Sequence, residues 1–440
     1  MNTNMVKGFS KLTKEEKRQW ICQTYLDKEP SAEQVFATYD LADSNLQKLH
    51  DDFIENAIGN YVLPFAVAPN FLIDGRNYTV PMVVEESSVV AAVSKAAKFW
   101  SEHGGFHCQV RSMEKVGHIH LFFDGNKQEL FQFFNQIDAL LYEDTSALTE
   151  NMRKRGGGIS SIMLKDMTDS LEHYYQVFVT FLTGDAMGAN FINSCLEQMT
   201  QTIEREALTH ITHGNLEVLM SILSNYTPQC LVRAEVSAPT SQMSYNDITG
   251  EEFASDFVRA IAVANADVYR AVTHNKGVMN GIDAVVIATG NDFRAVEAAA
   301  HAYAAKEGRY KSLTQASLTD GIFHYSIEIP LAIGTVGGLT KLHPMVRTAL
   351  KILENPSAEA LMRIIACVGL AQNFAAVSSL VTHGIQKGHM KMHLVNILNQ
   401  LGATPEEKQQ LMDYFKDKTV SHSEVVQEKL LRVSSASTPI

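Results

Sequence analysis

The hydrophobic and polar residues of this chain predict a mixture of helices and strands. Apolar side chains recur at helical spacing over residues 128–148 and 251–271, which predicts two long amphipathic helices. Their apolar stripes are Leu130, Phe133, Phe134, Ile137, Leu140 and Leu141 in the first, and Phe253, Phe257, Ile261 and Val263 in the second. The second helix should carry Arg270 close to its end.

Shorter segments rich in alternating or β-branched and aromatic residues predict strands. A helix should follow the first strand at 89–100, because Ser87 and Ser88 can start it. An alanine-rich helix is expected at 293–303. The predicted strand segments are 78–84, 118–123 and 174–183.

Composition and charge narrow the class of protein. A chain of 440 residues can form two or three domains, and a net charge of −12 argues against a general binder of nucleic acid or anionic membranes. The five cysteines are scattered without a CxxC pair, which is typical of reduced thiols in a cytosolic protein. Residues 1–20 are polar, and we expect no apolar run to approach the roughly 20 residues of a membrane span. We therefore expect a cytoplasmic protein without a membrane anchor.

Candidate chemistry concentrates in residues 268–294, where Arg270, Lys276 and Asp292 stand among small and apolar neighbours. Three glycines, Gly277, Gly281 and Gly290, are expected to break this stretch into turns. A partly desolvated Lys276 paired with a carboxylate could hold a proton or stabilise an oxyanion. The residue pattern alone favours the alternative of a surface lysine and a helix-capping Asp292.

A second candidate is the glutamate pair Glu85 and Glu86, at the junction between the first predicted strand and its helix. A glutamate between valines and a helix start could have a raised pKa and act as a general acid. The simpler alternative is a solvated pair that the helix dipole favours.

Glycine-rich segments offer places for phosphate. Successive glycines follow cations in residues 153–159, and Gly188 and Ala189 stand near a helix start, where backbone amides can bind an anion. No GxGxxG follows a strand, and residues 334–341 have the wrong spacing for a phosphate loop. His118 and His120 would share one strand face and could bind a metal, but no further ligand stands at suitable spacing.

Several ordered motifs together resemble one family. The motifs are ENAIG at 55–59, VPM at 80–82, EESSVVAA at 85–92, DAMGAN at 185–190, THNKG at 273–277, MNGID at 279–283, ATGND at 288–292 and GHM at 388–390. In this order, over roughly residues 50–400, they resemble class II 3-hydroxy-3-methylglutaryl-coenzyme A (HMG-CoA) reductases, the soluble bacterial form. The chain departs from that pattern at Ser87, where proline is usual, at Ala66, where glycine is frequent, and at the two histidines.

The resemblance implies reductive deacylation of HMG-CoA to mevalonate and coenzyme A by two hydrides. Lys276 would stabilise the oxyanion, Asp292 would hydrogen-bond Lys276 and tune Glu86, Glu86 would supply protons, and His389 would protonate the thiolate. By the same resemblance, Arg270 would pair with the free carboxylate of the substrate. The implied substrate contacts are Ser88, Asn225, Arg270, Asn280 and Gln372.

The resemblance also implies a nicotinamide cofactor and no metal. We expect NADPH, with NADH possible, and we expect the choice to depend on Lys154, Arg155, Lys165 or Asp166, since a 2′-phosphate needs a cation and a free 2′-hydroxyl favours an acid. The implied cofactor contacts are Asp185, Met187, Gly188, Ala189, Asn190, Arg155, Gly156 and Gly157.

For the fold, the resemblance implies an α+β protein that assembles as a homodimer or as several dimers. A large, mostly helical domain for substrate binding and dimerisation would comprise 1–109 and 218–378, with a small α/β dinucleotide-binding domain inserted at 110–217. A helical C-terminal flap would follow at 379–428, and then a tail at 429–440. Three alternatives stay open: a catabolic enzyme that oxidises mevalonate, an inactive acyl-coenzyme A binding protein, and a structural or assembly protein.

Overall fold

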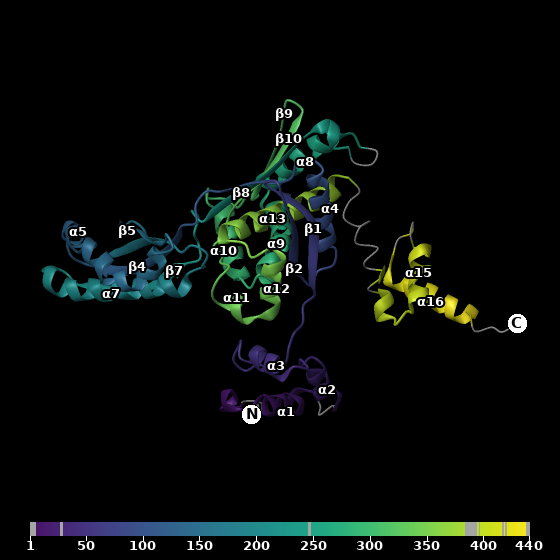
Figure 1. Ribbon diagram of the computed structural model, residues 1–440, viewed down its shortest axis with the longest axis horizontal. Helices are drawn as coiled ribbons and strands as arrows, with labels where there is room; N and C mark the ends of the chain where they lie inside the picture. The colour runs from purple at the N-terminus through teal and green to yellow at the C-terminus, as the bar shows by residue number, and fades with distance from the viewer. Residues whose placement is uncertain are drawn as a thin grey trace. The chain divides into compact units, whose positions relative to one another are not determined.

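The computed structural model describes residues 6–26, 30–244, 248–382, 394–395, 397–415, 418 and 420–436. It has the mixed helix and sheet content that the sequence predicts (Figure 1). The chain divides into two compact units, Met1–Pro64 and Phe65–Ile440. We predicted residues 1–64 as part of the large domain, but in a single chain they make most of their contacts with one another.

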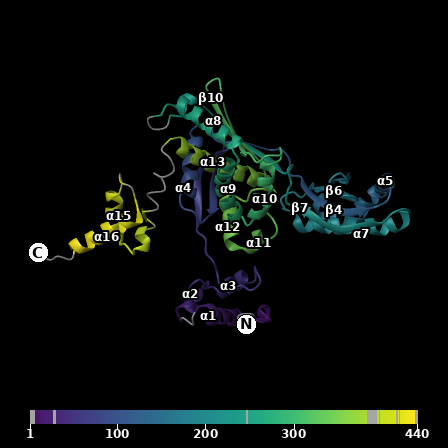
Figure 2. The same ribbon diagram turned by 180° about the vertical axis from the view of Figure 1, so that it is seen from behind.

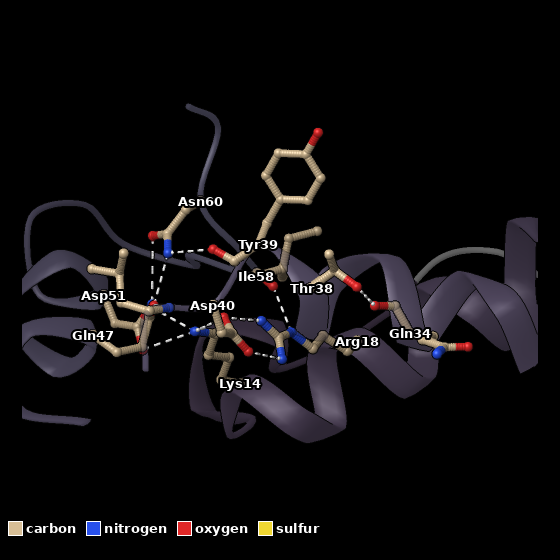
Figure 3. Close-up of polar contacts among 11 residues, drawn as sticks. Lys14, Arg18, Gln34, Thr38, Tyr39, Asp40, Gln47, Asp51, Ile58 and Asn60 are labelled. Carbon is tan, nitrogen blue, oxygen red and sulfur yellow. Dashed lines mark hydrogen bonds and ion pairs between the residues drawn. The ribbon is translucent and has the colours of Figure 1, made fainter. Parts of the chain in front are cut away.

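The first unit is held together by ion pairs among its helices (Figure 3). Lys14 Nζ lies 3.0 Å from Asp40 Oδ1 and 2.8 Å from Asp51 Oδ1, and the Arg18 guanidinium donates two hydrogen bonds to Asp40. Hydrogen bonds from Arg18 and Lys14 hold the pKa of Asp40 below its ordinary value. The helices are α1 (Lys14–Tyr25), α2 (Pro30–Thr38) and α3 (Ser44–Asp51), after the short 3-10 turn η1 (Phe9–Lys11).

The main core of the second unit surrounds two long helices, α9 (Val268–Ala288) and α13 (Ala358–Val381), which lie side by side in both views (Figures 1 and 2). An antiparallel sheet in the order β3-β8-β10-β9 and the hairpin β1-β2 pack around them. The strands are β1 (Phe65–Ile73), β2 (Arg76–Val83), β3 (His107–Val110), β8 (Leu231–Pro239), β9 (Thr314–Thr319) and β10 (Ile322–Pro330). The remaining elements are α4 (Val89–Ser101), η2 (Thr240–Gln242), α8 (Gly250–Ala266), α10 (Phe293–Ala304), α11 (Leu339–Leu342) and α12 (Pro344–Ile352).

Helix α9 corrects two predictions. The helix predicted at 251–271 ends at Ala266, and the Asp267 side chain caps a new helix by accepting the backbone N–H groups of Tyr269 and Arg270. The stretch that follows is one continuous helix, although we expected Gly277 and Gly281 to break it. Gly281 serves close packing, because a Cβ atom there would lie 2.9 Å from the carbonyl oxygen of Val368 on α13.

A second antiparallel sheet, in the order β5-β6-β4-β7, has its own hydrophobic core (Figure 1). Its strands are β4 (Lys115–Phe123), β5 (Gly158–Asp166), β6 (Tyr174–Leu182) and β7 (Leu216–Ser224), and its helices are α5 (Lys127–Asp144), α6 (Ser146–Arg153) and α7 (Ala189–His210). Two boundaries differ from the prediction. Thr145 separates α5 from α6, where we expected one helix, and β7 continues this sheet to Ser224, beyond the predicted boundary at 217.

The C-terminal part of the chain also departs from the prediction. Contrary to our expectation, α13 is long and apolar enough to cross a membrane by length and composition, with a mean hydropathy of 1.8 over its best window. That window is 72% buried inside the protein, and helices of a folded core satisfy the same criteria. Beyond it, α15 (Pro405–Tyr414) and α16 (His422–Ala436) are helical, so the predicted tail at 429–440 begins within α16.

We predict opposite effects of alanine at the two glycines inside α9. Gly281→Ala should lower the free energy of unfolding by about 1 kcal/mol or more, because overpacking outweighs the gain in helix propensity. Gly277→Ala is the matched control, since the nearest atom to its new Cβ would be 3.8 Å away, and should be neutral or stabilising. Urea unfolding of both variants checks this, and equal stability of the two would contradict the packing role of Gly281.

Candidate active site

A pocket of about 410 Å³ brings six of the predicted site residues together. Its walls come from the start of α4, one face of α9 and the C-terminal half of α13. The predicted residues that line it are Glu86, Ser88, Arg270, Lys276, Asn280 and Gln372. Segments far apart in the sequence therefore meet at one cavity.

The centre of the pocket is an ion pair between Glu86 and Lys276. Lys276 Nζ donates to Glu86 Oε2 at 2.8 Å, and Asn280 Nδ2 approaches the same oxygen at 3.4 Å. Lys276 and Asn280 stand four residues apart on α9 and therefore on one helix face. In a single chain the Lys276 and Glu86 side chains are 62% and 39% exposed, so burial does not desolvate the lysine as we expected. An exposed pair of this kind contributes only about 0.2–1 kcal/mol to stability.

Backbone strain marks the loop that presents Glu86. Ser88 has φ of 75°, a left-handed conformation that residues with a side chain rarely adopt, and its side chain forms no capping hydrogen bond. Such strain often occurs at functional sites. Ser87, where the chain departs from the motif, also lines the pocket.

One wall of the pocket contains the guanidinium of Arg270 and the imidazole of His274. Burial lowers the pKa of Arg270, and the guanidinium forms no ion pair with any residue that the structure describes. Burial, and then the charge of Arg270, lower the pKa of His274 to about 3, so this histidine is neutral at physiological pH. Its Nε2 lies 2.7 Å from Thr314 Oγ1. A carboxylate ligand would supply the counter-charge that Arg270 lacks.

The opposite wall offers an unused acceptor. The Gln372 side chain is buried, and its Oε1 has no hydrogen-bond partner among the described residues. Its neighbour Asn373 is engaged: it donates to the carbonyl of His274 at 3.0 Å and accepts the Tyr325 hydroxyl. A buried acceptor without a partner is costly, and a hydroxyl or amide of a ligand would satisfy Gln372.

Asp292 does not meet Lys276 within one chain. It caps α10 by accepting the backbone N–H groups of Arg294 and Ala295, at 3.1 and 3.2 Å, which is the simpler role we considered. From position 276 to its end at 288, α9 rises about 18 Å, which separates the two side chains. The predicted hydrogen bond between Lys276 and Asp292 is therefore absent in a single chain.

Two other predicted residues are not placed in the pocket. Asn225 is exposed in the connection between β7 and β8 and does not line the cavity. His389 lies outside the residues that the structure describes. Their proposed roles stay predictions.

The predicted cofactor residues gather at one end of the second sheet. Gly158 pairs with Leu182, so the turn with Arg155, Gly156 and Gly157 lies beside the loop that follows β6. That loop contains the DAMGAN motif and leads into α7, whose first turn has no side-chain cap. Free amide groups at the start of a helix of 22 residues, beside a glycine turn with cations, suit the phosphates of a dinucleotide.

Within this loop, Asp185 and Gly188 have structural partners. Asp185 Oδ1 accepts the backbone N–H of Ala358, the first residue of α13, at 2.7 Å, while Ser357 caps the helix by accepting the N–H of Ala360. Gly188 has φ of 91°, and a Cβ there would collide with Thr183. Met187 packs against the backbone at Gly334, while Ala189 and Asn190 begin α7. The loop is thus fastened to the core at the start of α13, whose C-terminal half lines the pocket.

The four candidates for cofactor choice lie at two separate places. Lys154 and Arg155 precede the glycine turn, whereas Lys165 and Asp166 stand at the far end of β5, about 26 Å along the strand. Asp166 is paired with Lys127, and hydrogen bonds from Lys127 and Thr168 lower its pKa to about 2. Only the first two are therefore near the uncapped end of α7.

The two histidines of β4, His118 and His120, lie next to each other. The rings of His118 and His120 are neighbours, 5.6 Å apart, but His120 Nδ1 contacts the Tyr174 hydroxyl at 2.6 Å. Burial lowers the pKa of both rings, that of His118 to about 4. The described residues contain no group of three or more histidine, cysteine or acidic side chains that could hold a metal ion.

Our sequence reasoning missed five polar residues at the pocket. The five that also line it are Lys95 on α4, Thr273, His274, Asn373 and Ser379. Lys95 stands seven residues after Ser88 and could have been found as the cation on the same face of the predicted helix. His274 lies inside the THNKG motif and Asn373 directly follows Gln372. Nothing in the sequence distinguished either of them from the predicted site residue nearby.

The chain is similar to known proteins over most of its length. The family model for hydroxymethylglutaryl-coenzyme A reductase matches residues 13–394. The 3-hydroxy-3-methylglutaryl-coenzyme A reductase of Archaeoglobus fulgidus is 41% identical over 366 residues, which cover 82% of this chain and 80% of that protein. A probable reductase of the same name from Borreliella burgdorferi is 32% identical over 383 residues, covering 85% of this chain and 84% of its own.

A solved structure is also similar. The class II 3-hydroxy-3-methylglutaryl-CoA reductase from Streptococcus pneumoniae, bound to NADPH in open conformations, matches with a TM-score of 0.72 and 35% identity. The match covers 86% of this chain and 99% of that one.

We predict that Asp185 stabilises the fold even without a cofactor. Asp185→Ala should lower the free energy of unfolding by about 1 kcal/mol, because it removes the acceptor for the backbone N–H of Ala358, the first residue of α13. Asn190→Ala, at an exposed position in the same motif, is the control and should leave stability unchanged. Thermal unfolding of the protein without cofactor checks this, and an unchanged transition in Asp185→Ala would show that this hydrogen bond is dispensable.

Proposed function

Since the chain belongs to the hydroxymethylglutaryl-coenzyme A reductase family, a family of oxidoreductases, we propose that it reduces HMG-CoA to mevalonate and free coenzyme A. The observation that carries the proposal is the pocket in which Glu86, Lys276 and Asn280 form one polar cluster beside the unpaired Arg270. The overall change consumes two NADPH and two protons. It breaks the thioester C–S bond and delivers two hydrides to the same carbon.

Substrate recognition follows from the charges in the pocket. Arg270 is partly buried and has no counter-ion among the residues that the structure describes. It suits the free carboxylate of the substrate, since a guanidinium can bind a carboxylate through two hydrogen bonds. Gln372 provides a buried acceptor, and Ser88 and Asn280 line the same cavity. Because His274 is neutral, it adds no second charge next to Arg270.

The chemistry then falls to the polar cluster. The Lys276 ammonium would stabilise negative charge that develops on the thioester oxygen as the first hydride arrives. Glu86, in hydrogen-bond contact with Lys276, would supply the proton for each carbonyl oxygen as it is reduced. It would take the first proton back when the C–S bond breaks, so the net uptake is one proton on the thiolate and one on the final alcohol. His389 would protonate the departing thiolate, a task that suits a side chain with a pKa near neutrality.

The cofactor would bind where the second sheet meets the main core. NADPH supplies the hydrides, and its phosphates would be held by the glycine turn with Arg155, Gly156 and Gly157 and by the uncapped start of α7 at Gly188, Ala189 and Asn190. The cations Lys154 and Arg155 favour a 2′-phosphate, hence NADPH over NADH. Asp185 and Met187 would fix the loop, since both contact the core.

The Asp292 carboxylate would complete the site from a second copy of the chain. It cannot reach Lys276 along α9, yet its side chain is half exposed, and its capping bonds and its ion pair with Arg294 all use Oδ1, which leaves Oδ2 for another subunit. In a two-fold dimer, the partner's Asp292 would approach Lys276 and would desolvate the exposed Glu86–Lys276 pair. We therefore propose a homodimer, or an assembly of dimers, in the cytoplasm, with residues 379–428 acting as a flap over the pocket.

The absorbance of reduced cofactor at 340 nm tests the reaction. Purified protein is mixed with HMG-CoA and either NADPH or NADH, and we expect oxidation of NADPH with two equivalents consumed per substrate. Faster reduction of NAD by mevalonate and coenzyme A would instead favour the catabolic direction. Binding of HMG-CoA without oxidation of either cofactor would support an inactive homologue.

We predict that Lys276 and Asp292 act across the subunit interface. Lys276→Ala and Asp292→Ala should each lower turnover by at least ~10², the scale of losing an oxyanion donor. A heterodimer with one chain of each variant should recover about half the wild-type turnover, because one of its two sites then holds both native residues.

Co-expression of the two variants with different affinity tags gives this heterodimer, and each homodimeric variant is the control. A heterodimer as inactive as its parents would refute the shared site, because two residues of the same chain cannot complement each other in this way.

A further inference from the structure

Two of the five cysteines lie in contact with each other outside the proposed active site. Cys108 Sγ on β3 is 3.1 Å from Cys367 Sγ on α13, and both are free thiols. A disulfide needs a separation of about 2.05 Å, so closure requires a movement of only about 1 Å. Strand β3 and helix α13 already pack against each other, which means that the pair is held in place by the fold.

The two thiols differ in accessibility. Cys108 is partly exposed, and its backbone N–H donates to Asp74 Oδ1 at 3.0 Å. Asp74 and Arg363, whose carbonyl lies 3.8 Å from Cys108 Sγ, line a pocket of about 350 Å³ next to the pair. Cys367 is fully buried, and burial followed by the neighbouring Cys108 raises the pKa of its thiol well above the ordinary value. A small oxidant would therefore reach Cys108 first.

The remaining cysteines lack such a neighbour. Cys195 and Cys230 are fully buried in separate places, and burial raises the pKa of both thiols, that of Cys195 to about 12. Cys22 belongs to the N-terminal unit. Among the five thiols, all within the described residues, this geometry singles out one pair.

We propose that Cys108 and Cys367 form an oxidative modification site that closes to a reversible disulfide on exposure to a hydroperoxide. The peroxide O–O bond breaks as Cys108 becomes a sulfenic acid, and the reduced peroxide leaves as water or an alcohol. Cys367 sulfur then attacks the Cys108 sulfur. The sulfenic hydroxyl departs with the Cys367 proton as water. Together the two thiols lose two electrons and two protons, which reduce one peroxide.

The crosslink would join the sheet to the helix that forms one wall of the pocket. Gln372 stands five residues after Cys367, about 7.5 Å further along α13. A disulfide at this position would fix α13 against β3 without occupying the cavity. It would also protect Cys108 from further oxidation, because the sulfenic acid is consumed by Cys367.

Peptide mapping of the full chain tests the proposal. The native protein is treated with hydrogen peroxide, blocked with N-ethylmaleimide, digested without reductant and analysed by mass spectrometry. We expect titratable thiols to fall from five to three, a peptide that links Cys108 to Cys367, and full reversal by dithiothreitol.

Two variants separate this site from general oxidation. In Cys367→Ser the linked peptide should disappear and Cys108 should advance to sulfinic acid, whereas Cys230→Ser should still form the link. Persistence of five thiols in the treated protein, a link to a different cysteine, or unchanged Cys108 chemistry in Cys367→Ser would each overturn the proposal.

Discussion

The close contact between α9 and α13 is the constraint on which the pocket depends. Gly281 and Gly369 allow it from the two sides: a Cβ at Gly281 would lie 2.8 Å from the Gln372 side chain, and one at Gly369 would lie 2.8 Å from Ile282. Any larger residue would force the helices apart or push side chains from their rotamers. Since Lys276 and Asn280 stand on one helix and Gln372 on the other, this distance sets the width of the cavity.

The charges of the pocket fit both the proposed carboxylate ligand and the proposed second subunit. Arg270 is partly buried without a carboxylate, and a charge removed from water is costly until it is paired. The Glu86–Lys276 ion pair differs from Arg270, because both of its charges are paired but its side chains are still exposed to water. A bound carboxylate would neutralise the charge of Arg270. Burial by a partner copy would strengthen the attraction between Glu86 and Lys276.

The loop at 184–190 connects the two halves of the proposed site. It presents the uncapped start of α7 on one side, and on the other its Asp185 holds the start of α13. The backbone N–H of Thr335 also donates to the Asp185 carbonyl at 2.8 Å. The loop proposed for the cofactor is thus hydrogen-bonded to the helix that lines the substrate pocket. A movement of the loop would therefore strain its hydrogen bond to α13.

The sequence by itself determined most of the elements, the family and the residues of the pocket, because apolar periodicity and short motifs are local properties of the chain. Glu86, Arg270, Lys276 and Gln372 could be named in this way. Only the tertiary structure decided that Gly281 lies inside a helix, since the close approach of α13 that requires glycine involves residues distant in sequence. It also decided that Asp292 is separated from Lys276 by the length of α9, that Asp185 accepts a hydrogen bond from the start of α13, and that Cys108 meets Cys367. Each of these depends on which segments pack together, and a pattern along one segment does not contain that information.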